Sequence, residues 1–341
     1  MSRISAVALA IVVAILLSVL ATLSIGPAVS LSDVAATLGS RIFGGSVQPP
    51  SETADNIIWL IRVPRALMAV AVGGGLAVVG VAMQALVRNP LAEPYILGLS
   101  SGASAGASLF FLGLLPPLLS RTATLSGAAF LGGLASVTVV YVIARDGSRI
   151  SVARLLLAGV AMSALMGSVT SLITFASPDP DKLRTVLFWL LGSLGGSRWE
   201  MLTLPLLASI GGGVVLLGFA RQMDALLVGE EPALSLGVSV EFLKVMLILI
   251  GAFVTGTLVA ATGVIGFVGL IIPHVVRLLI GVSHHRVLPL SFGLGAVFLI
   301  WSDVVARSVL PAQDIPVGIV TAVCGVPFFL ALLRTSRYRF G

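Results

Sequence analysis

Residues 245–276 read VMLILIGAFVTGTLVAATGVIGFVGLIIPHVV, which is 32 consecutive positions without an acidic residue, lysine or arginine. A helix needs about 20 apolar residues to cross the hydrocarbon core of a bilayer, so this run is too long for one crossing and too short for two full ones. Gly263, Gly266 and Pro273 interrupt it, and these residue types break or kink helices. The run therefore predicts one full helix followed by one short helix.

Eight further runs lack charged residues, and the chain as a whole is 57% hydrophobic and only 10% charged. Soluble domains are about 25% charged, so a water-soluble fold is excluded. Only helices and closed barrels satisfy backbone groups in lipid, and alternating strand patterns are absent. The sequence predicts an all-α polytopic membrane protein of about ten transmembrane helices, in a single domain over residues 1–341. The eight runs are residues 4–31, 66–87, 95–120, 122–144, 155–178, 201–220, 287–302 and 315–333.

The charge distribution predicts which side of the membrane each segment faces. With an even number of crossings and the amino terminus inside, twelve of the 20 Lys and Arg residues lie in cytoplasmic segments. Six of the 14 acidic residues lie there too, so the whole net charge of +6 faces the cytoplasm. Membrane proteins generally carry an excess of Lys and Arg in their cytoplasmic loops. Both termini are predicted to be cytoplasmic, and the basic balance requires no nucleic-acid partner.

Several functional classes lack their sequence signatures. The chain has no phosphate-binding Gly-x-x-x-x-Gly-Lys-Ser/Thr segment and no His-Glu-x-x-His pair, and its histidines, His274, His284 and His285, are expected near one cytoplasmic turn. We therefore predict no enzyme activity, cofactor or metal site in this chain. An ion-coupled carrier usually keeps charged residues deep in the bilayer. The only acid well inside a run is Asp303, which is expected either to pair with Arg307 four residues on or to serve at the surface.

Several motifs in order resemble the FecCD-type permeases of ATP-binding-cassette (ABC) importers, which import ferric siderophores, haem and vitamin B12. The resemblance implies ten helices per subunit and a homodimer in the bacterial inner membrane. It also implies two ATPase subunits, which use ATP and Mg, on the cytoplasmic side and a periplasmic binding protein above. The motifs are Arg62-Val-Pro-Arg65, Gly80-Val-Ala-Met-Gln84, Asn89-Pro-Leu-Ala-Glu-Pro94, residues 263–277, and Ser302-Asp-Val-Val-Ala-Arg307.

The resemblance assigns docking of the binding protein to Arg62, Arg65 and Arg307. Pro64 suits the first turn of a helix, which would place Arg62 and Arg65 on one face at the outer surface. Arginines retained outside run against the positive-inside tendency, and acids on a docking protein would explain them. Anchoring to lipid headgroups is the alternative.

On the inner face, residues 229–238 resemble the family's ATPase-coupling helix. Acids stand at the positive amino end, Pro232 falls in the first turn, and a glycine ends the helix. An ordinary amphipathic loop helix is the alternative. The predicted coupling residues are Glu230, Glu231, Ala233, Leu236 and Gly237.

Two further cytoplasmic turns match segments that form the family's inner gate, although each also suits a plain connection. They contribute Asn89, Pro90 and Leu91, and Ser151 and Val152. Outside, the segment from residue 179 to residue 193 looks like the family's short helix beside the ligand vestibule. Its Lys182 and Arg184 are expected to meet a carboxylated ligand such as haem or to lie in water.

The sequence thus predicts the permease subunit of an importer that carries an iron chelate, haem or a ferric siderophore, into the cytoplasm by alternating access. Vitamin B12 (cobalamin) is the alternative cargo, since family members share these motifs while carrying different chelates. The competing class is an ion-coupled or facilitative carrier. The coupling-type segment and the lack of deep charges favour the importer.

Overall fold

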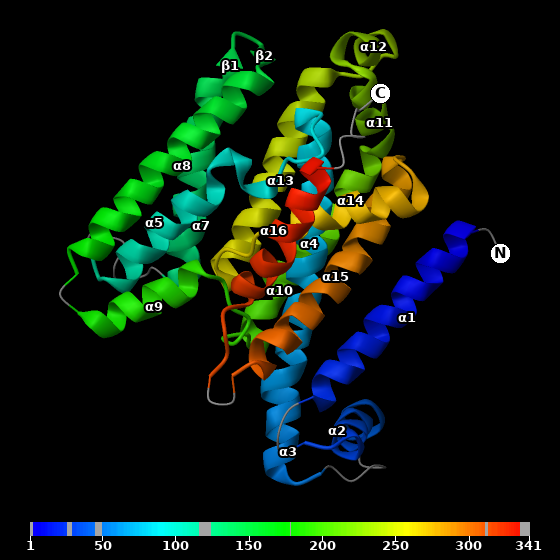
Figure 1. The fold of residues 1–341 in the computed structure, drawn as a ribbon, viewed down its shortest axis with the longest axis vertical. Coiled ribbons are helices and arrows are strands. Elements are labelled where there is room, and N and C mark those ends of the chain that lie inside the picture. The colour runs from blue at the N-terminus through cyan, green and yellow to red at the C-terminus, as the bar shows by residue number, and fades with distance from the viewer. Residues whose placement is uncertain are drawn as a thin grey trace.

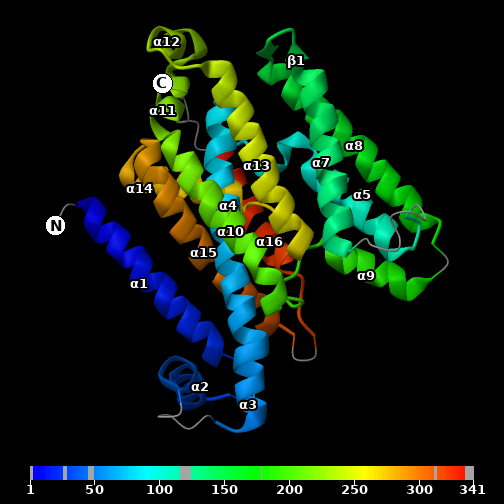
Figure 2. The same cartoon turned by 180° about the vertical axis from the view of Figure 1, so that it is seen from behind.

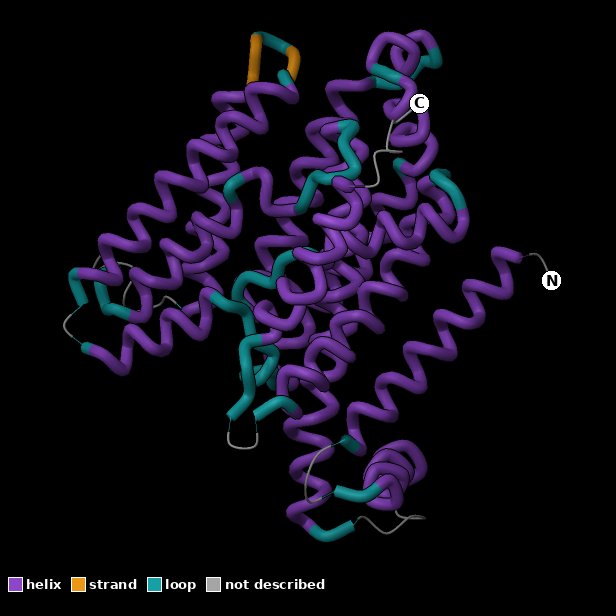
Figure 3. Tube along the Cα trace, viewed as in Figure 1, coloured by secondary structure: helices purple, strands orange, loops and turns teal. Residues whose placement is uncertain are grey.

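The computed structural model describes residues 3–25, 29–44, 50–115, 124–177, 179–310 and 313–334. These residues are almost entirely helical, and the strands they contain form one short antiparallel hairpin (Figure 3). The elements are α1 (Arg3–Ser24), α2 (Leu31–Phe43), α3 (Glu52–Asn56), η2 (Ile57–Arg62), α4 (Val63–Val87), η3 (Pro94–Leu97), α5 (Leu99–Phe111), α7 (Leu125–Ala144), β1 (Arg145–Asp146), β2 (Arg149–Ile150), α8 (Val152–Phe175), α9 (Pro180–Leu190), α10 (Trp199–Gly218), α11 (Ala220–Val228), α12 (Glu230–Ser235), α13 (Val240–Thr262), α14 (Val268–Ile280), α15 (His284–Ser308) and α16 (Val317–Arg334).

Six helices of the described residues are long and apolar enough to cross a membrane. Three shorter apolar helices accompany them, over Leu9–Ser24, Val268–Ile280 and Val317–Leu332. The predicted predominance of helices is therefore confirmed. The six long helices are Glu52–Val87, Leu125–Ala144, Val152–Phe175, Trp199–Gly218, Val240–Thr262 and His284–Ser308.

The predicted interruption of the 245–276 run is present. Helix α13 ends at Thr262 and α14 begins at Val268, so one long helix is followed by a short one. Gly263 has a φ of +74°, and a Cβ there would overlap the carbonyl oxygen of Trp189. Phe267 also has a positive φ, of 68°, which is uncommon for a bulky residue. The break is thus fixed both by backbone conformation and by close packing.

The entry to α4 has a feature that the sequence did not predict. Pro64 lies in the first turn of α4, as predicted, but α4 continues without a break from α3 and the π-helical segment η2, so the helix runs from Glu52 to Val87. A proline inside a helix lacks an N–H and clashes with the carbonyl four residues before it. Here the preceding turn is widened, with the Val63 N–H donating to the Ile58 carbonyl five residues back. The π-helical turn accommodates the proline and lengthens the helix beyond the apolar run.

Helix α4 lies at the centre of the bundle, where it packs against α10, α13, α14 and α15 (Figure 1). Its closest contacts are between glycines. A Cβ built on Gly73 would overlap the Gly295 carbonyl of α15, and one built on Gly80 would overlap the Gly269 carbonyl of α14. Small residues of this kind let membrane helices approach closely and gain dispersion energy along their length.

A second group of helices, α5, α7, α8 and α9, lies beside this centre in both views (Figures 1 and 2). Helices α5 and α7 are in contact at Gly102 and Gly132. A Cβ built on either glycine would overlap the carbonyl oxygen of the other. Gly106 faces the Ala128 carbonyl in the same way.

The two ends of the bundle carry different elements. The hairpin β1–β2, α11 and α12 lie at one end, which we call the α12 end (Figure 2). Helices α2 and α3 and the segment that precedes α16 lie toward the other, which we call the α2 end (Figure 1). The predicted coupling segment, which forms α12, lies at the first of these ends.

Candidate functional site

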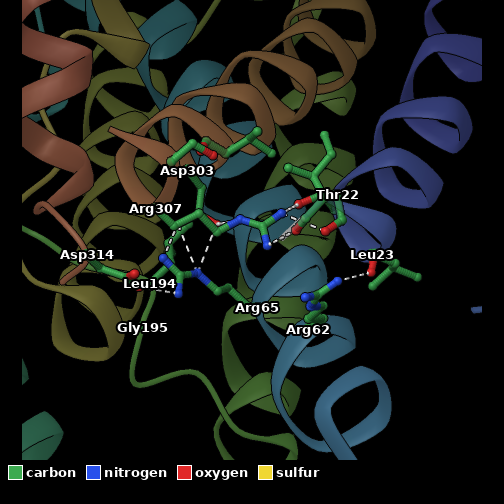
Figure 4. A network of polar contacts seen from close by, with 12 residues as sticks. Thr22, Leu23, Arg62, Arg65, Leu194, Gly195, Asp303, Arg307 and Asp314 are labelled. Carbon is green, nitrogen blue, oxygen red and sulfur yellow. Dashed lines mark hydrogen bonds and ion pairs between the residues drawn. The ribbon is translucent and has the colours of Figure 1, made fainter. Parts of the chain in front are cut away.

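At the α2 end, Arg65 of α4 is held by two aspartates (Figure 4). Its Nε and Nη2 each donate at 2.9 Å to the two carboxylate oxygens of Asp303 on α15. Its Nη1 donates to Asp314 Oδ2 at 2.6 Å. The Asp303 side chain is only 4% exposed, so a planar guanidinium satisfies a buried carboxylate with two parallel hydrogen bonds.

The other two predicted docking arginines bind the carboxyl end of α1 (Figure 4). Arg62 Nη1 donates to the Leu23 carbonyl at 2.6 Å. Arg307 donates to the Thr22 carbonyl at 2.6 Å and to the Ile25 carbonyl at 2.9 Å. The last carbonyls of a helix lack intrahelical partners and carry partial negative charge, so these cations cap α1.

The structure therefore brings the three arginines together but turns them inward. Arg62 is 9% exposed and the other two are largely buried, whereas the sequence predicted side chains projecting from the outer surface. The expected pairing of Asp303 with Arg307 is secondary, because their closest approach is 4.0 Å and Arg65 occupies the carboxylate.

A second polar cluster fixes the break between α13 and α14. The Glu93 carboxylate accepts the Phe267 N–H at 3.1 Å, and the Tyr95 hydroxyl donates to the Ile265 carbonyl at 2.7 Å. Gln84 donates to the Gly269 carbonyl at 3.2 Å and accepts a hydrogen bond from Arg277. Gln84 and Glu93 lie within the motifs quoted above, but the sequence did not predict that they line the break. Their partners are more than 170 residues away in the chain.

The two predicted gate turns are both shaped by side-chain caps. Asn89 Oδ1 accepts the Leu91 N–H at 2.9 Å, which folds the residues around Pro90 into a tight turn. Ser151 accepts the Arg154 N–H at 3.3 Å and so caps α8, whose first residue is Val152. Each of these capped turns would suit a plain connection between helices as well as a gate.

The predicted coupling segment forms a short helix at the α12 end. Helix α12 begins at Glu230 and stops before Gly237, whose φ is +81°, as the acid, proline and glycine pattern predicts. Ala233 is fully buried and anchors the helix. Two apolar side chains project from it instead of packing, Leu234 at 56% exposure and Leu236 at 71%.

The acids of α12 have different surroundings. Glu230 is half-buried and its Oε2 accepts a hydrogen bond from Lys244 Nζ at 2.7 Å. Glu231 is exposed. The sequence did not indicate Lys244 as part of this site, since the residue lies fourteen positions further along, at the start of α13.

Helix α9 presents both predicted vestibule residues to solvent. Lys182 and Arg184 are exposed, and the Arg184 guanidinium lies over the Phe188 ring, 5.7 Å from its centroid. Asp179 caps the helix: its Oδ1 accepts the Asp181 N–H at 3.0 Å and the Lys182 N–H at 3.3 Å. The helix thus holds two cations on a rigid surface beside the bundle.

The histidines do not form the single cluster that the sequence predicted. His274 lies within α14 with its ring edge-on to Phe328. His284 is buried at the start of α15, where its Nδ1 lies 2.6 Å from Asp224 Oδ1. Although burial raises the pKa of the Asp224 carboxyl, hydrogen bonds from the His284 ring and backbone outweigh it and lower that pKa overall. In the described part of the chain, no group of three His, Cys, Asp or Glu side chains is placed to hold a metal.

Comparison with known proteins agrees with this architecture. The FecCD transport family matches residues 10–335. The chain is 42% identical over 295 residues to the cobalamin import system permease protein BtuC of Halobacterium salinarum, covering 84% of this chain and 76% of that protein. It is 43% identical over 285 residues to the hemin transport system permease protein HmuU of Yersinia pestis, covering 82% and 84%.

A solved structure resembles the whole molecule. It is an inward-facing conformation of an ABC transporter described as of the metal-chelate type, with a TM-score of 0.82 and 30% identity. The match covers 97% of this chain and 99% of that chain. Family motifs, relatives and fold thus agree over nearly the entire sequence, and the chain belongs to the FecCD transport family of ABC importer permeases.

Proposed function

We propose that this chain is the membrane subunit of an importer that moves an iron chelate, haem or a ferric siderophore, from the periplasm to the cytoplasm by alternating access. It hydrolyses no ATP itself; two partner ATPase subunits use ATP and Mg beneath a homodimer of the permease. The observation that carries the proposal is α12, a rigid short helix with a buried anchor and two exposed leucines at the basic end of a family permease.

The proposed topology has ten crossings in the bacterial inner membrane. The six long helices are joined in this topology by α1, α5, α14 and α16. The α12 end is proposed to face the cytoplasm, because the hairpin arginines Arg145 and Arg149, Arg154 at the start of α8 and Arg221 of α11 lie there. Arg337 and Arg339, which add to the same bias, lie outside the described residues.

The α2 end is proposed to receive a periplasmic binding protein through Arg62, Arg65 and Arg307. These arginines already have internal partners, so docking acids would have to exchange with Asp303 or with the carbonyls of α1. Such an exchange would release the carboxyl end of α1 and transmit docking into the bundle.

Two observations support an iron chelate as cargo. The hemin permease HmuU is 43% identical to the chain, and α9 exposes Lys182 and Arg184, cations suited to the carboxylates of haem. Vitamin B12 is the alternative, supported by the cobalamin permease at 42% identity.

An ion-coupled carrier is less well supported. The spans hold more buried charge than the sequence indicates, including Asp303 and Lys244, but each of these charges is paired within the chain at one end of the bundle. Asp303 and Lys244 are therefore compensated within the chain and need no coupling ion.

Arginine docking is tested by the variant Arg307→Gln in nanodiscs, with Thr22→Val as the matched control. Thr22→Val removes the hydroxyl that Arg307 contacts at 2.6 Å but keeps the arginine. We expect Arg307→Gln to weaken binding-protein affinity at least about tenfold by surface plasmon resonance and Thr22→Val to leave it nearly unchanged. Equal effects of the two variants would mean that the arginine serves α1 and not docking.

Seating of the ATPase on α12 is tested by the pair Leu234→Asp and Leu236→Asp. Both side chains are exposed, so the permease should fold normally, while a carboxylate buried in an apolar cleft disfavours the complex. We expect the tagged permease to purify without its ATPase. The control is Val228→Asp, an equivalent change at an exposed position of the neighbouring helix α11, and this variant should retain the ATPase. Retention in all variants would contradict the coupling role.

The cargo is identified by growth of a deletion strain, with and without this gene, on a single limiting nutrient. We expect a defect on haem or on one ferric siderophore, restored by the gene on a plasmid. A defect confined to vitamin B12 would keep the importer and replace the cargo.

A further inference from the structure

Lys244 is a fully buried lysine at the α12 end. Its side chain is 2% exposed, and its Nζ makes three hydrogen bonds to three different parts of the chain. It donates to Glu230 Oε2 on α12 at 2.7 Å, to Glu241 Oε1 on α13 at 3.1 Å and to the Ile150 carbonyl of β2 at 3.0 Å. An ammonium has three protons, so every one is used.

The same cluster holds Ile150 from both sides of its peptide backbone. Its carbonyl accepts from Lys244, and its N–H donates to Glu241 Oε2 at 2.7 Å. The next residue, Ser151, donates its N–H to the Ala144 carbonyl and caps α8 with its side chain. A displacement of Ile150 is therefore passed directly to the first turn of α8.

The path from α12 to this hairpin runs through Lys244. Helix α12 packs on α11 and on the start of α13, and β2 packs on α13, while α12 and the hairpin lie on either side of α13 (Figure 2). Charge-assisted bonds to a desolvated ammonium are stiff and costly to break, since an unpaired buried charge remains. The link is consequently stronger than the sparse packing between these elements.

We propose that Lys244 is a positioning residue that transmits the movement of α12 to the β1–β2 hairpin and to the amino end of α8. This inference rests on the proposed function of α12 as the ATPase-coupling helix. In this arrangement the ATPase moves Glu230, the ammonium follows, and the Ile150 backbone carries the displacement to Ser151 and Val152, the residues of the second predicted gate turn.

The link is tested first in the permease alone, by hydrogen exchange of the hairpin amides. Glu230→Ala removes the α12 side of the cluster without touching the hairpin, and Glu231→Ala on the same helix is the matched control, since its side chain is exposed. We expect exchange over residues 145–151 to rise at least about threefold in Glu230→Ala and about tenfold in Lys244→Met. The control should match the unmodified chain. Equal exchange in Glu230→Ala and Glu231→Ala would overturn the link.

The second test uses the complex with its ATPase and binding protein in vesicles. Lys244→Met leaves the predicted coupling residues of α12 unchanged, and in this variant we expect uptake of the chelate per ATP hydrolysed to fall about tenfold. A merely structural role would lower hydrolysis and uptake together with the amount of folded complex, and unchanged uptake per ATP would overturn the inference. If the unmodified complex showed no ATP-driven uptake, the proposed function would fail, whereas the exchange experiment would still decide the link.

Discussion

The close approach of α4 to its neighbours is the constraint on which the rest of the structure depends. Where Gly73 meets Gly295 and Gly80 meets Gly269, helix backbones touch and no Cβ can be inserted. Helix association in lipid gains little from the hydrophobic effect, so such contacts and interhelical polar bonds provide the stability. The second contact also seats α14 against α4 beside the break, whose loop is held by Glu93 and Tyr95. A rigid centre of this kind allows small displacements at either end to be transmitted rather than absorbed.

Within the described residues, two clusters of buried ion pairs join separate elements. At the α2 end, Arg65 ties α4 to α15, and Arg62 and Arg307 hold the carboxyl end of α1. At the α12 end, Lys244 ties α12 to α13 and to the hairpin before α8. Each cluster lies where a proposed partner would bind. Each also consists of buried charges, which are costly to leave unpaired. Docking and ATP-driven closure would thus act on paired charges rather than on loops.

The sequence predicted the helices, the interrupted 245–276 run and the short helix α12, because these follow from local patterns of apolar residues, acids, proline and glycine. It did not predict the π-helical turn before Pro64, since such a turn leaves no local signature. It also did not predict the partners of the candidate site. Arg65 and Asp303 are 238 positions apart, and nothing local distinguishes a projecting arginine from one that binds a distant aspartate. Lys244 looked like an ordinary cytoplasmic base for the same reason. The roles of the docking, gate and vestibule residues remain predictions.

The central claim is that transport through this chain is driven by ATP on a separate subunit. It is tested most directly by uptake of radiolabelled iron chelate into vesicles that contain the permease, its ATPase and its binding protein, with ATP enclosed and a protonophore added. We predict that uptake requires enclosed ATP and Mg and persists when the protonophore collapses the proton gradient. Uptake that continued without ATP and stopped with the protonophore would contradict the account and establish a proton-coupled carrier.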